Sequence, residues 1–231
     1  MKKIWITLVI FSFLILFSIP CSAAPKAVLV DPNFKFQPLP EGEELIHEFV
    51  VKNQGDTPLN IIKVVPPWGC DSRSYDKQIP PGGEGKIKIG FKTAGYGGRT
   101  LSKRILVQTD DPAHSKVYLA ISGAVEKVVD IDPPSVNMKG VPGEVLETTV
   151  TITPAEKYAF SILDMKQQFH KNITAELVKP DGQDRSWKLK IKTQSQKPDT
   201  LYEVITLNTD SKYRPNLKIR VYAFYENQKK S

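Results

Sequence analysis

The sequence is poor in the residues that build metal and redox sites. Its 231 residues include only two cysteines and three histidines. The histidines, at positions 47, 114 and 170, are scattered along the chain. A zinc or copper site needs several ligands that converge with a specific spacing. We therefore expect no metal site and no cofactor.

Patterns of catalytic residues are also lacking. Asp110 and Asp111 are adjacent, so they would point to opposite faces of a strand and suit a turn better than an acid–base pair. The glycine-rich segments 82–85 and 95–98 are not followed by a helical pattern, which a phosphate-binding loop requires. No serine lies in a nucleophile elbow. We therefore predict that the protein is not an enzyme.

Basic residues outnumber acidic ones, 32 to 25, but they form no block. In segments 86–92 and 188–192 lysines alternate with apolar residues, as on the solvated face of a strand. Nucleic-acid binding calls for a localised basic patch with stacking aromatics beside it, and the sequence shows neither. We predict no nucleic-acid partner. An unspecific attraction to anionic envelope polymers or lipids stays open.

Long apolar runs occur only at the N-terminus. Lys2 and Lys3 precede the uncharged run 4–19. The small residues Cys21, Ser22 and Ala23 then offer a cleavage site for signal peptidase after Ala23. This is the pattern of a cleaved signal peptide, here residues 1–23, and it predicts export with no transmembrane span in the mature chain. A membrane anchor and a lipid on Cys21 are the alternatives. The run ends early for an anchor, and a proline is unexpected before a lipidated cysteine.

Alternating apolar and polar residues, bounded by Gly, Pro, Asn and Asp turns, dominate the rest of the chain. No helical pattern is long enough for a β-α-β crossover, so we predict an all-β protein. The segment 159–172 fits either a strand to about Met165 followed by a loop or a short helix, and the strand is preferred. The residues predicted to face a core are Phe49, Val51, Leu59, Ile61, Ile87, Ile89 and Phe91.

The strand pattern occurs twice. The segment ILVQTD at 105–110 resembles ITLNTD at 205–210, and KIKI at 86–89 resembles KLKI at 188–191. The offsets stay between 100 and 102 residues, close to the size of one immunoglobulin-like domain of about 100 residues. We therefore predict two tandem immunoglobulin-like β-sandwich domains, residues 24–126 and 127–231, after the signal peptide.

The first half carries a series of short motifs in a fixed order: Phe36, Gly42-Glu43, His47-Glu48-Phe49, Asn53 to Ile61, Pro81-Gly82-Gly83, Gly97-Gly98, Asp110-Asp111-Pro112 and Gly123-Ala124-Val125. In these motifs it resembles a bacterial family known as domain of unknown function 1573. The resemblance implies a bacterial protein with an immunoglobulin-like sandwich of the Hydin type, and it implies no established activity. The chain departs from the family's Cys-Gly-Cys loop, which is Trp68-Gly69-Cys70 here.

Cys70 is the only cysteine after the predicted cleavage site, so the mature chain can form no internal disulfide. In an oxidising compartment such a cysteine suggests a disulfide-linked dimer, a reactive thiol or a metal ligand. An inert, buried residue is the structural alternative. We expect Pro66 to Arg73 to form an exposed loop, in which Arg73 would lower the pKa of the thiol.

Exposed aromatic residues mark contact sites, and Trp68 lies in a proline-rich loop. The alternative is that Trp68 folds back over the end of the sandwich. The predicted binding residues are Trp68, Cys70, Arg73, Tyr75, Tyr96 and Arg99.

We predict a non-enzymatic protein-binding or scaffolding module of the periplasm or cell envelope, which recognises a protein partner through end loops or a sheet edge. The alternatives are a pilus-type periplasmic chaperone, which also has two immunoglobulin-like domains, and a thiol- or metal-handling protein that uses Cys70.

Overall fold

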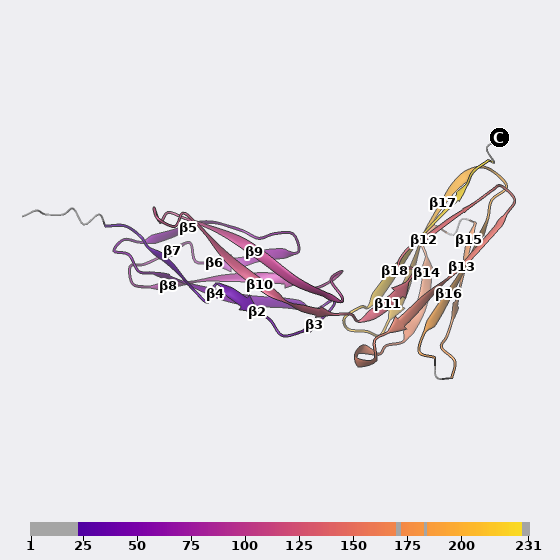
Figure 1. Ribbon diagram of the computed structural model, residues 1–231, viewed down its shortest axis with the longest axis horizontal. Helices are drawn as coiled ribbons and strands as arrows, with labels where there is room; N and C mark the ends of the chain where they lie inside the picture. The colour runs from indigo at the N-terminus through magenta and orange to yellow at the C-terminus, as the bar shows by residue number, and fades with distance from the viewer. Residues whose placement is uncertain (1–22, 170–171, 183, 228–231) are drawn as a thin grey trace, which may run out of the picture.

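The computed structural model describes residues 23–169, 172–182 and 184–227 (Figure 1). Its regular structure consists of strands and one short 3-10 helix, η1 (Glu156–Tyr158), which confirms the all-β prediction. Cys21, His170 and all but the last residue of the predicted signal peptide lie outside the described residues. The described part of the chain contains no helix with the length and hydrophobicity needed to cross a membrane.

The N-terminal half folds into two sheets. One has the order β1 (Ala27–Val30), β4 (Glu44–Asn53), β8 (Glu84–Lys92), β6 (Cys70–Tyr75). The other has the order β2 (Asn33–Lys35), β10 (Lys116–Glu126), β9 (Arg99–Thr109), β5 (Leu59–Val65), β7 (Gln78–Ile79), and β3 (Leu39–Pro40) also pairs with β10. These are the A-B-E-D and G-F-C sheets of an immunoglobulin-like sandwich, with the first strand divided between them.

The C-terminal half repeats this topology. One sheet has the order β11 (Val129–Asp132), β13 (Val145–Pro154), β16 (Trp187–Gln194), β15 (Ile173–Val178). The other has the order β12 (Val136–Gly140), β18 (Asn216–Tyr225), β17 (Asp199–Thr209), β14 (Ile162–Gln167). The predicted strand in segment 159–172 is therefore β14, displaced toward the C-terminus by two residues.

Each half has its own hydrophobic cluster, one drawn from Ala27 to Val125 and the other from Val129 to Tyr225. Alternation along the strands builds them. In β8, the fully buried Ile87 and Ile89 alternate with Lys86 and Lys88, whose charged ends reach solvent. Burying each such isoleucine contributes roughly 1.5–3 kcal/mol to folding. All seven residues predicted to face a core are buried.

The hairpin between the last two strands is the same in both halves. The hydroxyl of Thr109 donates to the carbonyl of His114 at 2.9 Å, and the hydroxyl of Thr209 donates to that of Arg214. The carboxylate of Asp110 accepts the N–H of Asn60, as the carboxylate of Asp210 accepts that of Ser161. The residues that repeat in the sequence thus form equivalent hydrogen bonds in the two halves.

The two sandwiches lie end to end (Figure 1). Charged side chains from both halves meet at their junction. The carboxylate of Glu41 in the first half contacts the guanidinium of Arg214 in the second and accepts the N–H of Gly95. The carboxylate of Glu126 accepts a hydrogen bond from Lys157 at 2.6 Å. Gly42 has a φ of +98° and lies against the backbone of Tyr213.

Candidate binding surface

Trp68 is the most exposed large hydrophobic residue of the described chain. It lies in the loop between β5 and β6, and its side chain is 82% exposed. Gly69 follows with a φ of +85°, a conformation that favours glycine, and turns the chain into β6. The prediction that Trp68 is exposed in its loop therefore holds, and Trp68 does not fold back to become buried.

Two side chains support the exposed tryptophan from below. The ring of Tyr96 lies 6.0 Å from the ring of Trp68 and is itself packed on Phe91. Lys103, on β9, donates from Nζ to the Tyr96 hydroxyl at 3.0 Å and to the Trp68 carbonyl at 3.3 Å. The same Nζ lies 5.9 Å from the Trp68 ring centroid and 4.8 Å from that of Tyr96. We call Trp68, Tyr96 and Lys103 the aromatic–lysine surface.

Sequence reasoning identified Trp68 and Tyr96 but missed Lys103. The lysine is 35 residues away from the tryptophan in the chain. Only the pairing of β9 between β5 and β10 brings it beneath the loop. A cation held against aromatic ring faces gains roughly 0.5–2 kcal/mol, depending on how far it is desolvated.

Cys70 lies beside this surface, half-buried at the start of β6 and opposite Phe91. Burial raises the pKa of its thiol, Lys103 opposes this shift and Asp71 adds to it. The thiol is therefore mainly protonated near neutral pH, and a protonated thiol is a poor nucleophile. This environment resembles that of a structural cysteine more than that of a reactive one.

The prediction for Arg73 was wrong. Its segment, Cys70–Tyr75, is the edge strand β6 and not an exposed loop. The guanidinium of Arg73 contacts the carboxylate of Glu44 and that of Asp71, the latter at 3.0 Å. The alternation of a strand turns residues 70 and 73 to opposite faces, so Arg73 does not lower the pKa of the thiol.

The remaining predicted site residues lie apart from the aromatic–lysine surface. Tyr75 ends β6 and packs against the core of the first sandwich. Arg99 begins β9, and its backbone N–H closes the turn by donating to the Tyr96 carbonyl at 3.1 Å. The structure thus gathers Trp68, Cys70 and Tyr96 and separates the other three.

Several other titratable groups of the described chain have structural partners. No three His, Cys, Asp or Glu side chains in the described ranges gather within metal-binding reach. His47 stacks on Phe34 at 3.5 Å, and burial lowers its pKa, which Glu48 partly opposes. At the junction, Arg214 and Lys157 each bind an acid, so neither is a free basic anchor of the kind a pilus-type chaperone uses.

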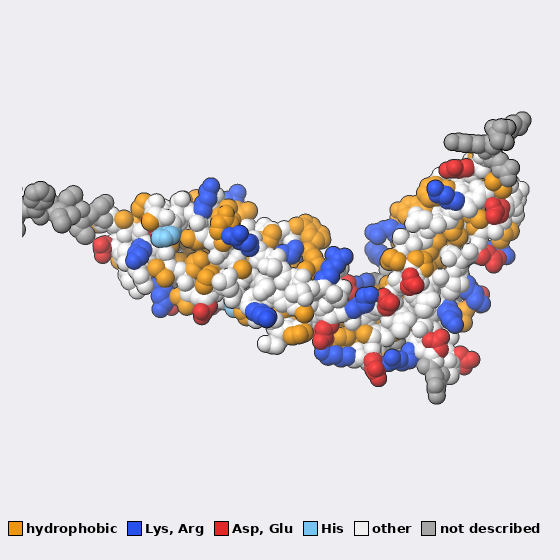
Figure 2. Space-filling view, in the orientation of Figure 1, with side chains coloured by type: hydrophobic (Ala, Val, Ile, Leu, Met, Phe, Trp, Pro, Cys, Tyr) orange, Lys and Arg blue, Asp and Glu red, His pale blue; other side chains and the backbone are white. Residues whose placement is uncertain are grey.

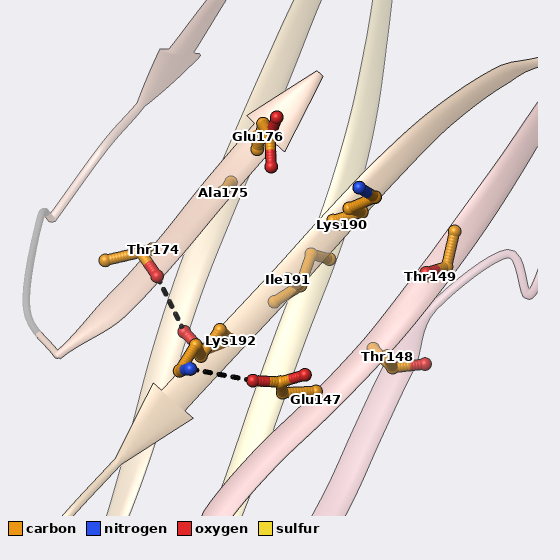
Figure 3. A pocket seen from close by; sticks show the side chains of 9 residues that line it. All are labelled: Glu147, Thr148, Thr149, Thr174, Ala175, Glu176, Lys190, Ile191 and Lys192. Atoms are coloured by element: carbon orange, nitrogen blue, oxygen red, sulfur yellow. Dashed lines mark hydrogen bonds and ion pairs between the residues drawn. The ribbon is translucent and has the colours of Figure 1, made fainter. Parts of the chain in front are cut away.

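An open hollow lies on the outer face of β13, β15 and β16 in the second sandwich (Figure 3). Lys192 pairs with Glu147 at 2.8 Å, and the hydroxyl of Thr174 donates to the Lys192 carbonyl at 3.3 Å. Figure 3 shows Lys190 between Glu176 and Thr149 on neighbouring strands. These cross-strand polar rows are typical of a solvated sheet face.

Residues 29–125 match the family described as "Protein of unknown function (DUF1573)". The resemblance predicted from the motifs is therefore confirmed for the first sandwich. A search of curated proteins gives no match for the chain.

Several solved structures are similar in fold. A protein of unknown function from Porphyromonas gingivalis W83 is 12% identical, with a TM-score of 0.36 and coverage of 86% of this chain and 99% of that one. The ASH/PapD-like domain 7 of human CEP192 is 14% identical, with a TM-score of 0.35 and coverage of 45% and 87%. Dpr11 IG1 bound to DIP-gamma IG+IG2 is 11% identical, with a TM-score of 0.29 and coverage of 88% and 100%. Such likeness concerns the fold alone.

The motifs of the DUF1573 segment serve the fold. Asn53 is buried, and its side-chain amide donates to the carbonyls of Thr57 and Ile79 at 2.8 and 3.0 Å. Its side-chain oxygen accepts the N–H groups of Lys26 and Gly55 at 3.2 and 3.0 Å. One residue therefore joins the start of β1, the β4–β5 corner and β7.

Asp111 has a similar role in the DUF1573 segment. Its buried carboxylate accepts the N–H groups of Ala27 and Ala113, both at 2.8 Å, and that of His114 at 3.1 Å. Burial alone would raise the pKa of this carboxyl, but the hydrogen bonds outweigh burial and lower it. Asn53 and Asp111, two residues of the matched motifs, thus stabilise the fold through buried hydrogen bonds.

Proposed function

We propose that this protein is a non-enzymatic binding module of a bacterial envelope, which docks a protein partner through the aromatic–lysine surface. The observation that carries the proposal is the 82% exposure of Trp68 on a support built from Tyr96 and Lys103. Folding alone gives no reason to hold a tryptophan in water. Tryptophan and tyrosine anchors dominate the energetics of protein interfaces.

The support beneath Trp68 favours a binding role. Lys103 ties the loop backbone to the sheet, and Tyr96 fixes the ring from one side. An anchor that is already ordered loses less conformational entropy on binding than a flexible one. A partner that covers Trp68 would also desolvate Lys103 and strengthen its attraction to both rings.

Export supports the same proposal. The N-terminal segment has the pattern of a signal peptide, and the DUF1573 resemblance points to a bacterium. The protonated, half-buried Cys70 gives no support to thiol chemistry as the main task. We therefore place the protein among envelope binding modules and not among thiol-handling proteins.

The test is site-specific photo-cross-linking in the native envelope. A photoreactive residue replaces Pro67, next to the anchor, and captured proteins are identified by mass spectrometry. The recovered partner is then purified, and its affinity for the mature chain is measured directly. We expect Trp68→Ala to weaken this affinity at least about tenfold, as the loss of a hot-spot residue does.

Tyr118 and Arg104 supply a matched control. They form a second cation–aromatic pair on the first sandwich, with the Arg104 guanidinium 4.3 Å from the Tyr118 ring and the tyrosine 47% exposed. Tyr118→Ala should leave the affinity unchanged. Equal losses in Trp68→Ala and Tyr118→Ala, or a loss confined to Cys70→Ser, would contradict the proposal.

A further inference from the structure

Four aromatic side chains of the second sandwich form a row in which each ring lies next to the following one. Phe169 lies 5.6 Å from Tyr202, and Tyr202 lies 4.8 Å from Tyr222, measured between ring centroids. Tyr222 lies 6.4 Å from Phe224 with the rings 9° from parallel. We call these four residues the aromatic row. Phe169 is 42% and Tyr202 is 36% exposed, and the other two are half-buried.

Strand register places the row on the outer face of the β12-β18-β17-β14 sheet. Tyr202 and Tyr222 are cross-strand partners on β17 and β18, and Phe224 lies two residues further along β18. Their neighbours Leu201, Val221 and Ala223 are buried on the inner face. The aromatic row therefore belongs to the solvent side of the sheet and not to the core.

Cations lie at both ends of the row on the same face. At one end Lys166 and Lys218 flank Thr206 across three strands, and Arg220 lies two residues along β18 from Lys218. At the other end Lys139 is the β12 partner of Phe224. Six residues separate positions 218 and 224, so the surface is about 20 Å long at the usual rise of a strand.

These four cations are free to meet a ligand. Within the described ranges, Lys139, Lys166, Lys218 and Arg220 form no ion pair. The nearby acids are engaged elsewhere. Asp164 accepts a hydrogen bond from the side chain of Asn208, and Asp199 accepts the N–H of Thr200. In Figure 2 hydrophobic and basic side chains lie side by side over the region of β12, β17 and β18.

The first sandwich shows that the fold does not require these aromatics. The positions equivalent to 202, 222 and 224 are Ser102, Ser122 and Ala124, which occupy the same strands and the same register. A sandwich of this topology thus forms with small residues there. The aromatic row is a property of the second sandwich alone.

We propose that this face of the second sandwich binds an acidic polysaccharide. The faces of aromatic rings carry negative charge density, to which the C–H groups on the face of a sugar ring are attracted. Carboxylate groups of the polymer would pair with the cations at the two ends. The surface is an open sheet face and not a pocket, so it suits an extended chain that passes across the rings.

Single-stranded nucleic acid uses related groups, but in another arrangement. Its binding sites combine stacking aromatics with a basic groove that follows the phosphate backbone. Here Lys166, Lys218 and Arg220 lie on one side of the rings along the strands, and Lys139 lies beside Phe224 on β12, so the cations form no continuous line along the rings. This arrangement favours a chain of sugar rings, whose faces can lie on the aromatic rings while their carboxylates reach the cations on either side. The inference concerns a different domain from the aromatic–lysine surface and does not depend on it.

The experiment measures binding of the mature chain to polygalacturonate by isothermal titration calorimetry, with neutral dextran as the uncharged comparison. We expect binding to polygalacturonate and none to dextran. The double variant Tyr202→Ala/Tyr222→Ala should lose about tenfold in affinity, from two aromatic contacts. The double variant Lys218→Glu/Arg220→Glu should lose at least about tenfold at low salt and less as the salt concentration rises.

Matched controls separate this surface from general charge. Lys188→Glu/Lys190→Glu changes two exposed residues with the same spacing on β16, in the opposite sheet of the same sandwich. Tyr118→Ala removes an exposed tyrosine from the corresponding sheet of the first sandwich. Both controls, and Trp68→Ala, should bind polygalacturonate like the parent chain.

Several results would overturn the inference. They are the absence of polygalacturonate binding, an equal loss in the control variants, and tighter binding of single-stranded poly(dT) or of polyglutamate than of polygalacturonate. Tighter binding of poly(dT) would assign the face to a nucleic acid, and tighter binding of polyglutamate would assign it to an acidic protein segment. Circular dichroism and thermal unfolding of each variant verify that the sandwiches stay folded.

Discussion

The two sandwiches hold the same loop in opposite ways. In both, the loop after the equivalent strand, β5 in one and β14 in the other, carries an exposed aromatic residue, Trp68 and Phe169 respectively. In both, the same position of the strand that pairs with it, β9 or β17, fixes that loop. This position is Lys103 on β9 and Glu203 on β17.

The sign of the charge decides which loop groups are bound. Lys103 donates to a carbonyl and a hydroxyl oxygen, whereas the carboxylate of Glu203 accepts the N–H groups of Gln168 and Phe169 at 2.8 and 3.0 Å. Glu203 is fully buried and Lys103 is half-buried. The fold therefore fixes where the loop lies. The side chain at this one position decides which groups of the loop are bound and how much free energy of folding a substitution there would cost.

Reversing the charge at the buried position should have the largest effect. Glu203→Lys places a cation among N–H donors without a counter-charge, and an uncompensated buried charge costs roughly 3–5 kcal/mol. Lys103→Glu in the first sandwich should cost about 1 kcal/mol or less, since water reaches that site. Denaturant unfolding of both variants measures the two costs, and equal values would contradict the comparison.

The corner of the first sandwich gives the next largest expected effect. Asn53→Ala leaves four buried or half-buried backbone groups without their partner, a loss of roughly 3 kcal/mol. The second sandwich has Pro154 at the corresponding end of β13, so its unfolding should not change. Asn137→Ala, at an exposed position of β12, is the control. A single unfolding transition that shifts as a whole would show that the two halves unfold as one unit.

The pH dependence of the first sandwich should reveal Asp111. The pKa of this carboxyl is lower in the folded protein than in the unfolded chain, where aspartate has a pKa of about 3.9. The stabilisation is therefore complete above the unfolded pKa and is lost as the pH falls through the folded pKa.

This loss should be absent where the carboxylate is absent. Asp111→Asn should lower the stability at neutral pH and flatten its fall below about pH 4. The second sandwich has Ser211 at the equivalent position and should show no such step. Thermal unfolding between pH 2.5 and 7 measures the slopes, and an unchanged slope in Asp111→Asn would refute the assignment.

The smallest expected effect concerns Cys70. Because burial raises its pKa, the thiolate fraction at pH 7.5 is below that of an unperturbed thiol, whose pKa is about 8.5. Alkylation by iodoacetamide should therefore be slower than for a cysteine in a short peptide, and it should accelerate with rising pH. Lys103→Met should slow it further, since the lysine favours the thiolate. Alkylation faster than in the peptide would restore the reactive-thiol hypothesis.

Patterns of period two made the fold predictable. The alternation around Ile87 and Ile89 and the repeat at offsets of 100 to 102 residues are visible in the sequence without any knowledge of tertiary contacts. The role of Asn53 was less visible, because its four partners come from three separate segments. Its place in a turn motif was correct, but its action across the corner depends on tertiary contacts.

The binding surfaces could be predicted only where one loop carries them. Trp68 stands out in a proline-rich loop, but Lys103 is recognisable only once β9 lies beneath that loop. The aromatic row combines residues from three separate segments, and so do the cations around it. No localised basic patch with aromatics beside it is visible in the sequence, because neither the aromatic residues nor the cations are contiguous in the chain.

Gly42 lies where the two sandwiches approach closely at the junction, against the backbone of Tyr213. A β-carbon at Gly42 would lie 1.9 Å from the carbonyl oxygen of Tyr213, so even a methyl group there would wedge the sandwiches apart. A strand of ten residues makes an arm of about 34 Å, and a tilt of about 10° at the junction swings its far end by about 6 Å. The absence of a side chain at residue 42 thus lets the two sandwiches approach this closely at the junction.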